Sequence, residues 1–413
     1  MNSFKVLFTL AFFVCLLERV KLLDNGLART PPMGWMSWGY YMCGDNCLDQ
    51  PHKCLDEELI LSVVDTFYND GYQEAGYEYI VIDDCWSERE RDSDGRLVPD
   101  RNRFPHGMKF ISDYIHSKGL KFGMYTNVAN ITCMHYPGSR GYFGIDAMTF
   151  AEWGVDYIKV DGCFVEESFL NTAYIKFGHY LNKTERPIVY SCSWPYYIEF
   201  KHNKTPDYSK VSAHCNLWRN YHDVYTSWPS VRDIVNHYKM AYSTLYQHHG
   251  PGGWNDPDML IIGTESLTES QSRIQLSVFA MLSAPLLLSC DMTKITEYER
   301  SLLQNLDLIA IAQDPLGIMA QPYELTYFIT LWVKKHLPMK GDKYHSFSFA
   351  LVNLYRRNFT VSFTPGSYGL QSKDGYTVMD VFTGNYLRNI TLEDSIIVTV
   401  PFEDVILYTL YAL

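Results

Sequence analysis

The chain of 413 residues is long enough for one large domain and a smaller second one, and its 47% apolar and 20% charged residues are typical of a globular protein. The net charge of −12 argues against a nucleic-acid-binding protein or one that binds an anionic membrane surface, because both need a basic face.

An apolar run near the N-terminus predicts a secretory signal peptide. Lys5 precedes an almost purely apolar run, residues 6–17, which is too short to span a bilayer. We place the signal peptide at residues 1–22 and expect no membrane span in the mature protein. Sequons of the Asn-x-Thr type fit this route, and they make candidate glycosylation sites of Asn130, Asn182, Asn203, Asn358 and Asn389.

The cysteines also fit a secretory route. Eight of them lie between residues 43 and 215, where an oxidising compartment would let them pair. The three at Cys43, Cys47 and Cys54 have no histidine at zinc-site spacing, so we expect no metal site. Cys290 lies in an apolar strand-like run and is predicted to be a buried free thiol.

Strand and helix signals alternate through the first three-quarters of the chain. In chain order we predict a helix at 56–69, a strand at 79–82, a helix at 108–118, strands at 121–125 and 157–161 flanking a helix at 145–153, and strands at 188–192 and 285–289. Repeated β-then-α units predict a (β/α)8 barrel over residues 23–315. The alternative is a doubly wound open sheet, but no Gly-x-Gly-x-x-Gly follows the first strand.

The pattern changes after about residue 316. Short β-type runs separated by turn residues follow, at 327–333, 346–354, 359–363, 376–382, 396–400 and 405–411. They predict an antiparallel β-sandwich over residues 316–413. No low-complexity linker separates the two units, so we expect them to pack closely.

Acidic residues stand where the predicted barrel strands end. Asp161 closes the run 157–161, Asp83 and Asp84 follow 79–82, and Asp256 and Asp258 lie beside Trp254. In a parallel barrel this edge carries the chemistry. Carboxylates among tryptophans suit sugar hydrolysis, which needs one carboxylate to attack or activate water and one carboxylic acid to protonate the leaving oxygen. No Gly-x-Ser-x-Gly, P-loop or His-Glu-x-x-His pattern supports serine, phosphoryl-transfer or zinc chemistry.

Several motifs, in order along the chain, resemble the glycoside hydrolase family of α-galactosidase and α-N-acetylgalactosaminidase. They are 23–31 (LDNGLARTP), 32–35 (PMGW), 82–86 (IDDCW), 161–163 (DGC), 215–220 (CNLWRN), 254–259 (WNDPDM) and 312–317 (AQDPLG). The resemblance covers the whole predicted barrel, whereas the C-terminal unit matches loosely. It implies a (β/α)8 fold and glycosidase activity without a metal or other cofactor.

The resemblance also implies roles for individual residues. Asp161 matches the nucleophile and Asp223 the general acid/base of a retaining mechanism, with carboxyl groups about 5–5.5 Å apart. On physical grounds Lys159 should hold Asp161 ionised, and Asp223 needs a raised pKa. The remaining residues matched to substrate-binding or pocket-lining positions are Trp38, Asp83, Asp84, Tyr125, Lys159, Cys163, Ser193, Tyr196, Tyr197, Arg219, Asp258 and Met259.

Four disulfides carry over by the same resemblance: Cys43–Cys85, Cys47–Cys54, Cys133–Cys163 and Cys192–Cys215. A homodimer and a lysosomal address are implied in the same way, with secretion from the cell as the alternative destination.

The segment 191–197 matches the loop that meets the 2-substituent of the sugar. Ser193 follows the pattern of the N-acetylgalactosaminidases, which leaves room for an acetamido group, whereas Tyr196 follows neither branch. We therefore predict an exo-glycosidase for terminal α-linked N-acetylgalactosamine on glycolipids, glycoproteins and oligosaccharides, with α-galactose as the alternative or second substrate.

Two other functions stay open at this point: a glycan-binding protein without turnover and a transglycosylase. Retention of both Asp161 and Asp223 speaks against the first. Tyr225 also departs from the family, which frequently has an acid at this position.

Overall fold

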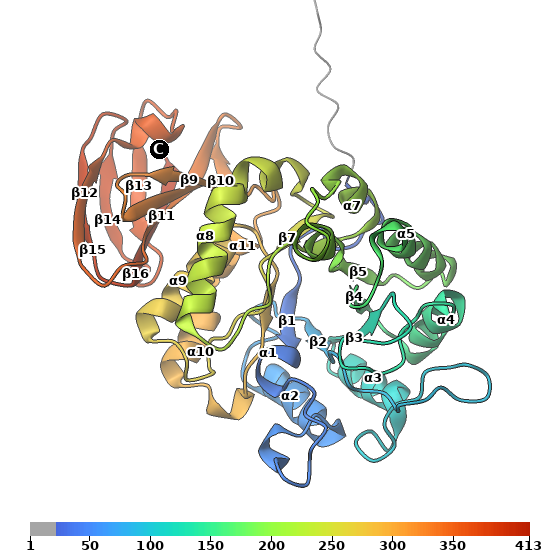
Figure 1. Cartoon of the computed structure of the whole chain (residues 1–413). Coiled ribbons are helices and arrows are strands. Elements are labelled where there is room, and N and C mark those ends of the chain that lie inside the picture. Colours follow the sequence, from blue (N-terminus) through green and yellow to red (C-terminus); the bar gives the residue numbers. More distant parts are fainter. Residues whose placement is uncertain (1–21) are drawn as a thin grey trace, which may run out of the picture.

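The first domain is built around eight parallel strands, seen in the computed structural model, which describes residues 22–413 (Figure 1). The strands are β1 (Met33–Met36), β2 (Tyr79–Val81), β3 (Lys121–Asn127), β4 (Tyr157–Asp161), β5 (Val189–Cys192), β6 (Leu217–Arg219), β7 (Trp254–Asp256) and β8 (Leu286–Leu288). Their order is β7-β6-β5-β4-β3-β2-β1-β8, and a parallel bridge between Leu260 and Leu288 joins the two ends. The predicted (β/α)8 barrel is confirmed.

The helices of the barrel domain are α1 (Trp38–Tyr41), α2 (Glu57–Asn69), α3 (Gly107–Ser117), α4 (Phe143–Trp153), α5 (Glu167–Lys183), α6 (Trp194–Tyr196), α7 (Tyr208–His214), α8 (Trp228–Leu245), α9 (Glu269–Met281), α10 (Glu297–Leu303) and α11 (Leu306–Ala312). Most of them surround the sheet on its outer side, whereas the short α1 and α6 lie at the ends of strands. In α2, Asp56 caps the first turn by accepting a hydrogen bond from the Leu59 N–H at 2.9 Å. The predicted apolar stripe of this helix, including Val64 and Phe67, is buried against the sheet.

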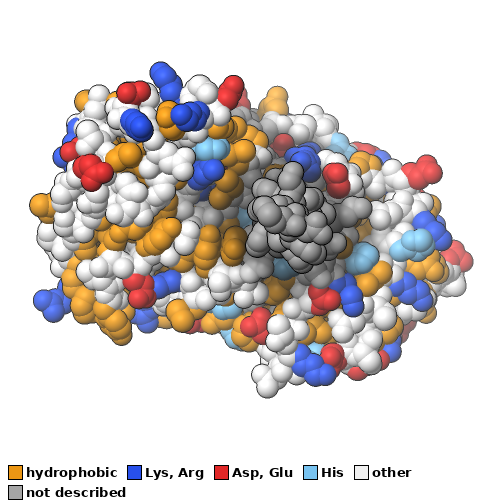
Figure 2. Space-filling model, turned by 90° about the horizontal axis from the view of Figure 1, so that it is seen from above, with side chains coloured by type: hydrophobic (Ala, Val, Ile, Leu, Met, Phe, Trp, Pro, Cys, Tyr) orange, Lys and Arg blue, Asp and Glu red, His pale blue; other side chains and the backbone are white. Residues whose placement is uncertain are grey.

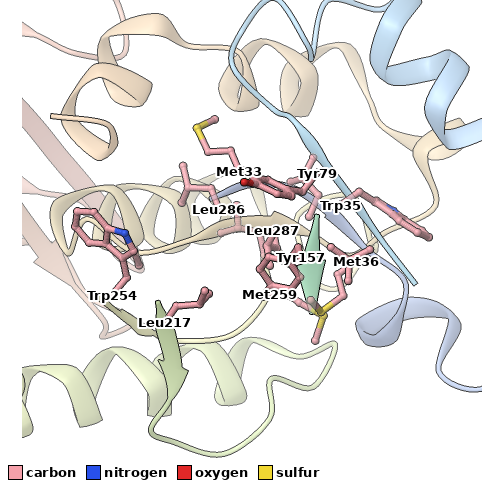
Figure 3. Packing of buried hydrophobic residues seen from close by; sticks show 14 of the residues in the cluster. Met33, Trp35, Met36, Tyr79, Tyr157, Leu217, Trp254, Met259, Leu286 and Leu287 are labelled. Carbon is pink, nitrogen blue, oxygen red and sulfur yellow. The ribbon is translucent and has the colours of Figure 1, made fainter. Parts of the chain in front are cut away.

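The strands are short and apolar on both faces because one face meets the helices and the other fills the barrel. Figure 3 shows the side chains of Met33 and Trp35 of β1, Tyr157 of β4 and Leu286 of β8 gathered in one cluster. A filled interior leaves room for a site only at the ends of the strands.

The second domain is an antiparallel β-sandwich, as predicted. Its six-stranded sheet has the order β14-β13-β16-β11-β10-β9, and β12 pairs with β15 in a second sheet. The bounds are β9 (Gln321–Glu324), β10 (Ile329–Lys340), β11 (Tyr344–Asn353), β12 (Phe359–Phe363), β13 (Tyr376–Asp380), β14 (Tyr386–Ile390), β15 (Ile396–Val400) and β16 (Asp404–Ala412). Phe349 and Phe363 meet between the two sheets with ring centroids 6.0 Å apart.

The other face of the six-stranded sheet packs on the barrel through α9. Trp332, Ala350 and Leu407 belong to the same buried cluster as the barrel core. Lys334 is fully buried at this junction, where its ammonium group donates to the carbonyl oxygens of Ala280 and Ile311 and to a serine hydroxyl. The two domains are therefore tightly joined.

Several predictions about processing meet the structure only in part. The signal peptide lies outside the described residues except for Leu22. The five sequon asparagines are exposed, so glycosylation there stays a prediction. No helix within residues 22–413 combines the length and apolarity needed to cross a membrane. Positive and negative side chains are interspersed over the face in Figure 2. Cys290 is buried and unpaired, as predicted.

Candidate active site

A pocket of about 240 Å³ lies at the C-terminal edge of the barrel strands. It is lined by Trp38, Asp83, Asp84, Tyr125, Cys133, Lys159, Asp161, Cys163, Ser193, Tyr196, Tyr197, Lys201, Arg219, Asp223 and Tyr225. These residues come from β3, β4 and β6 and from the segments that follow β1 to β6, so parallel strands bring together groups far apart in the sequence.

All the predicted catalytic and substrate-binding residues line this pocket except two. Asp258 lies behind the wall, where it binds Arg219, and Met259 is buried in the apolar core (Figure 3). The expectation that these two line the pocket was therefore wrong. Asp258 instead supports a residue that does.

Asp161 ends β4 with its carboxylate held in one orientation. Its Oδ2 accepts a hydrogen bond from the Tyr125 hydroxyl at 2.9 Å, and its Oδ1 accepts one from the Gly162 N–H at 3.0 Å. The Cys133 sulfur lies 3.1 Å from the same Oδ2. A carboxylate fixed in this way can present an oxygen to a substrate atom without first losing rotational freedom.

Lys159 lies two residues before Asp161, and its nearest partner is Asp83. Its ammonium group donates to Asp83 Oδ2 at 2.7 Å, and both side chains are buried. We expected the charge of Lys159 to act on Asp161, and Asp161 is one of the carboxylates whose charge acts on Lys159, although the direct ion pair is with Asp83. Alternation along β4 puts Lys159 and Asp161 on the same face, but the end of β2 places Asp83 within closer reach.

Asp84 is buried at the pocket edge with both carboxyl oxygens engaged. Oδ1 accepts from the Cys85 N–H at 2.7 Å and Oδ2 from the Met134 N–H at 3.1 Å. Burial nevertheless raises the pKa of Asp84 to about 7, with Asp83 adding to the effect and hydrogen bonds opposing it. In weakly acidic solution this side chain can therefore donate as well as accept.

Arg219 joins two carboxylates at the opposite side of the pocket. One guanidinium nitrogen lies 2.9 Å from Asp223 Oδ1 and the other 2.9 Å from Asp258 Oδ1. Asp258 also accepts from the Val224 N–H at 2.7 Å, which fixes the loop that carries Asp223. Burial raises the pKa of Asp258 to about 6 despite the neighbouring arginine.

The pKa of Asp223 differs from our expectation. Desolvation in the pocket raises this pKa, but the positive charges of Arg219 and Lys159 outweigh that effect and hold it below its usual range, and the side chain itself is 54% exposed. The sequence suggested a raised value because a general acid must carry a proton. The ion pair with Arg219 instead stabilises the carboxylate.

The wall beside β5 contains the residues matched to the sugar 2-position. Ser193 is buried, and the Tyr196 ring packs edge-on against Tyr197 at 5.2 Å and in a stacked arrangement on Phe200 at 5.6 Å. The same wall carries Lys201, at the end of the π-helical turn η2 (Tyr197–Lys201). The sequence did not predict Lys201 as a residue of the pocket.

Two more lining residues were not on the predicted list, Cys133 and Tyr225. Cys133 could have been found from its predicted bond to Cys163, which does line the pocket. Tyr225 could have been found from its place two residues after Asp223.

All four predicted disulfides are present: Cys43–Cys85, Cys47–Cys54, Cys133–Cys163 and Cys192–Cys215. Cys133–Cys163 bridges the segments that follow β3 and β4, directly beside Asp161. The loops around the pocket are therefore tied covalently to one another.

A barrel whose strand ends gather carboxylates, cationic side chains and aromatic rings in one pocket has the features of a glycoside hydrolase. A sequence model described as alpha galactosidase A matches residues 30–314. The chain belongs to this family of melibiase-type glycoside hydrolases, and it is an enzyme of that class.

Named relatives fall into both branches of the family. Alpha-N-acetylgalactosaminidase of Gallus gallus is 40% identical over 94% of this chain and 95% of its own length. Alpha-galactosidase A of Homo sapiens is 46% identical over 74% of this chain and 70% of its own length. Among solved structures, alpha-galactosidase I from Mortierella vinacea superposes with a TM-score of 0.81 at 28% identity, covering 94% of this chain and 98% of that one.

Proposed function

We propose that the protein is a retaining exo-glycosidase that removes terminal α-linked N-acetylgalactosamine, with α-galactose as a second substrate. The observation that carries the proposal is that the Asp161 and Asp223 carboxylates line one pocket. Around them stand cationic and acidic side chains that can bind the hydroxyl groups of a sugar. The substrates are glycans of glycolipids, glycoproteins and oligosaccharides.

In the first step Asp161 attacks the anomeric carbon while Asp223 gives a proton to the leaving oxygen, which produces a covalent glycosyl-enzyme. In the second step Asp223 takes a proton from water, and the water oxygen displaces Asp161. The hydrogen bonds that Tyr125 and Gly162 make to Asp161 support an oriented nucleophile. The carboxyl separation of about 5–5.5 Å stays a prediction.

Asp223 must be protonated in the first step, although its ion pair with Arg219 stabilises the ionised form. A sugar hydroxyl that takes over the Arg219 hydrogen bond would release Asp223 and let its pKa rise as the pocket closes around the substrate. Arg219 would then couple substrate binding to proton supply.

The preference for N-acetylgalactosamine is supported by Ser193, whose small buried side chain lines the pocket, and by relatives of that name that align over nearly the whole chain. The second candidate, an α-galactosidase with little activity on the amino sugar, is favoured by Tyr196, whose ring takes up space on the same wall. Stacking on Phe200 holds that ring against the wall.

The two candidates are separated by kcat/KM on the paired aryl α-glycosides of the two sugars. We expect the N-acetylgalactosaminide to be the better substrate, and a large preference for the galactoside would establish the second candidate instead. Asp161→Asn serves as the control for the chemistry, because it should abolish both activities and keep the fold. A homodimer in the lysosome or outside the cell completes the proposal.

A further inference from the structure

Two hollows continue the active-site pocket across the surface. The first shares Asp223 and Tyr225 with the pocket and extends over the start of α8. The second shares Ser227, Pro229 and Arg232 with the first and ends on the sandwich domain. Because neighbouring hollows share lining residues, the three lie in series from the catalytic pocket to the junction of the domains, where α8 lies beside the sandwich (Figure 1), and we refer to them together as the groove.

The groove begins on the side where the leaving group must lie. In the double displacement the general acid stands next to the oxygen that leaves, opposite the nucleophile. Asp223 is the acid, and it is also the residue at which the pocket opens into the groove. Whatever is attached to the departing oxygen is therefore directed along α8.

The groove offers aromatic faces and an unengaged cation. The Tyr225 side chain is 69% exposed, while its backbone N–H is anchored to the Ser230 hydroxyl at 2.9 Å. At the far end Tyr355 is 40% exposed and rests edge-on against Phe328 at 5.1 Å. Between them, the exposed Arg232 guanidinium makes no hydrogen bond or ion pair within residues 22–413.

This chemistry suits sugars better than acyl chains. Tyrosine rings cover the apolar faces of sugar rings and their hydroxyls bond to water or sugar, while a free guanidinium donates up to five hydrogen bonds to hydroxyl, carbonyl or acidic groups. The aliphatic residues in the described walls are Pro229, which is exposed, Ile234, which is almost fully buried, and Leu354, which is half-buried. No continuous aliphatic surface is available to a lipid tail along the described walls.

We propose that this groove, defined by Tyr225, Ser227, Pro229, Arg232, Tyr355 and Arg356, binds an oligosaccharide leaving group of several sugars that reaches the sandwich domain. The inference rests on the proposed function and adds the substrate class to it: extended glycans, whose inner sugars contribute binding energy at a distance from the bond that breaks. Remote binding energy of this kind raises kcat/KM without changing the reacting groups.

The test uses substrates with one terminal sugar and different leaving groups. The glycosyl fluoride has no leaving-group sugar, a disaccharide has one, a tetrasaccharide has three, and a glycolipid carries an acyl chain. The variants are Arg232→Gln and Tyr355→Ala, both outside the catalytic pocket. Tyr386→Ala is the matched control, since Tyr386 is exposed on the sandwich and lines none of the three hollows.

We expect wild-type kcat/KM to be higher for the tetrasaccharide than for the disaccharide by about tenfold, which corresponds to about 1.4 kcal/mol of groove binding. Arg232→Gln and Tyr355→Ala should each remove several-fold of that gain and leave hydrolysis of the fluoride unchanged. Tyr386→Ala should change neither. Thermal unfolding of each variant shows whether it is folded. If Tyr355→Ala does not fold, its loss of kcat/KM is set aside and Arg232→Gln carries the test.

The results separate the two levels of the argument. If the wild-type protein hydrolyses neither the N-acetylgalactosaminyl fluoride nor the galactosyl fluoride, the proposed function fails. If it hydrolyses the fluoride but shows no gain with glycan length, the groove proposal is overturned while the proposed function stands. A glycolipid that outperforms the tetrasaccharide, with the gain lost in Arg232→Gln, would assign the groove to a lipid.

Discussion

Asp84→Asn should reverse the order of stability between acidic and neutral pH. The pKa of this buried carboxyl moves from 3.8 to about 7 on folding, so the folded protein holds a proton that the unfolded chain has lost throughout that interval. Stability contributed by Asp84 therefore falls as pH rises from about 4 to about 7, by about 4 kcal/mol in all. Asparagine does not titrate, and the variant lacks this loss.

The substitution also has a cost that does not depend on pH. The Asn amide oxygen can still accept from the Cys85 N–H, but its NH2 group cannot accept from the Met134 N–H, and one lost hydrogen bond is worth about 1 kcal/mol. Asp84→Asn should therefore be less stable than wild type by about 1 kcal/mol near pH 3, where neither state has lost the proton, and more stable by up to about 3 kcal/mol near pH 7.5.

Thermal unfolding of both proteins at the two pH values measures the effect. The comparison uses the difference between variant and wild type, because other groups titrate in the same interval, including His237, whose burial lowers its pKa to about 4. Asp94→Asn, in an exposed loop, is the control and should follow wild type. Parallel curves for wild type and Asp84→Asn would refute the argument that burial governs this carboxyl.

Two further predictions concern the loops around the pocket. Arg219→Lys keeps a positive charge near Asp258 but loosens the contact with Asp223, so the pKa of Asp223 should rise. The alkaline limb of the pH profile of kcat/KM should then move to higher pH. An unchanged profile would show that Arg219 does not determine the pKa of Asp223. Replacing Cys133 and Cys163 together by serine should cost about 2–5 kcal/mol and lower kcat, as followed by unfolding and by assay, and full activity would show that the Asp161 loop holds itself.

The fold class was predictable, although the long helices α5 and α8 were not among the predicted elements and several short or edge strands were missed. Long stripes such as that of α2 carry a periodic signal, and Asp56 marks the start of the helix. Strands β6 and β7, with three residues each, are too short for a pattern, and β9 and β14 lie at the two edges of their sheet, where exposed residues blur the alternation.

The residues of the site were predictable from motifs, whereas their pairing was not. Asp83 lies far from Lys159 in the sequence. The two side chains meet only because β2 pairs with β3 and β3 with β4 in the sheet. The same holds for Arg219, whose two carboxylate partners determine the pKa of Asp223. Motifs record which groups are present, but charge balance depends on distances that spacing along the chain does not contain.

The direct test of the central claim is to trap the covalent intermediate. A fluorinated glycosyl fluoride of the preferred sugar, which forms the glycosyl-enzyme but releases it slowly, should label the protein once, and mass spectrometry of its peptides should place the sugar on Asp161. The label should be absent from Asp161→Asn. A label on another carboxylate, or turnover with inversion at the anomeric carbon and no label, would contradict the assignment of Asp161 as nucleophile.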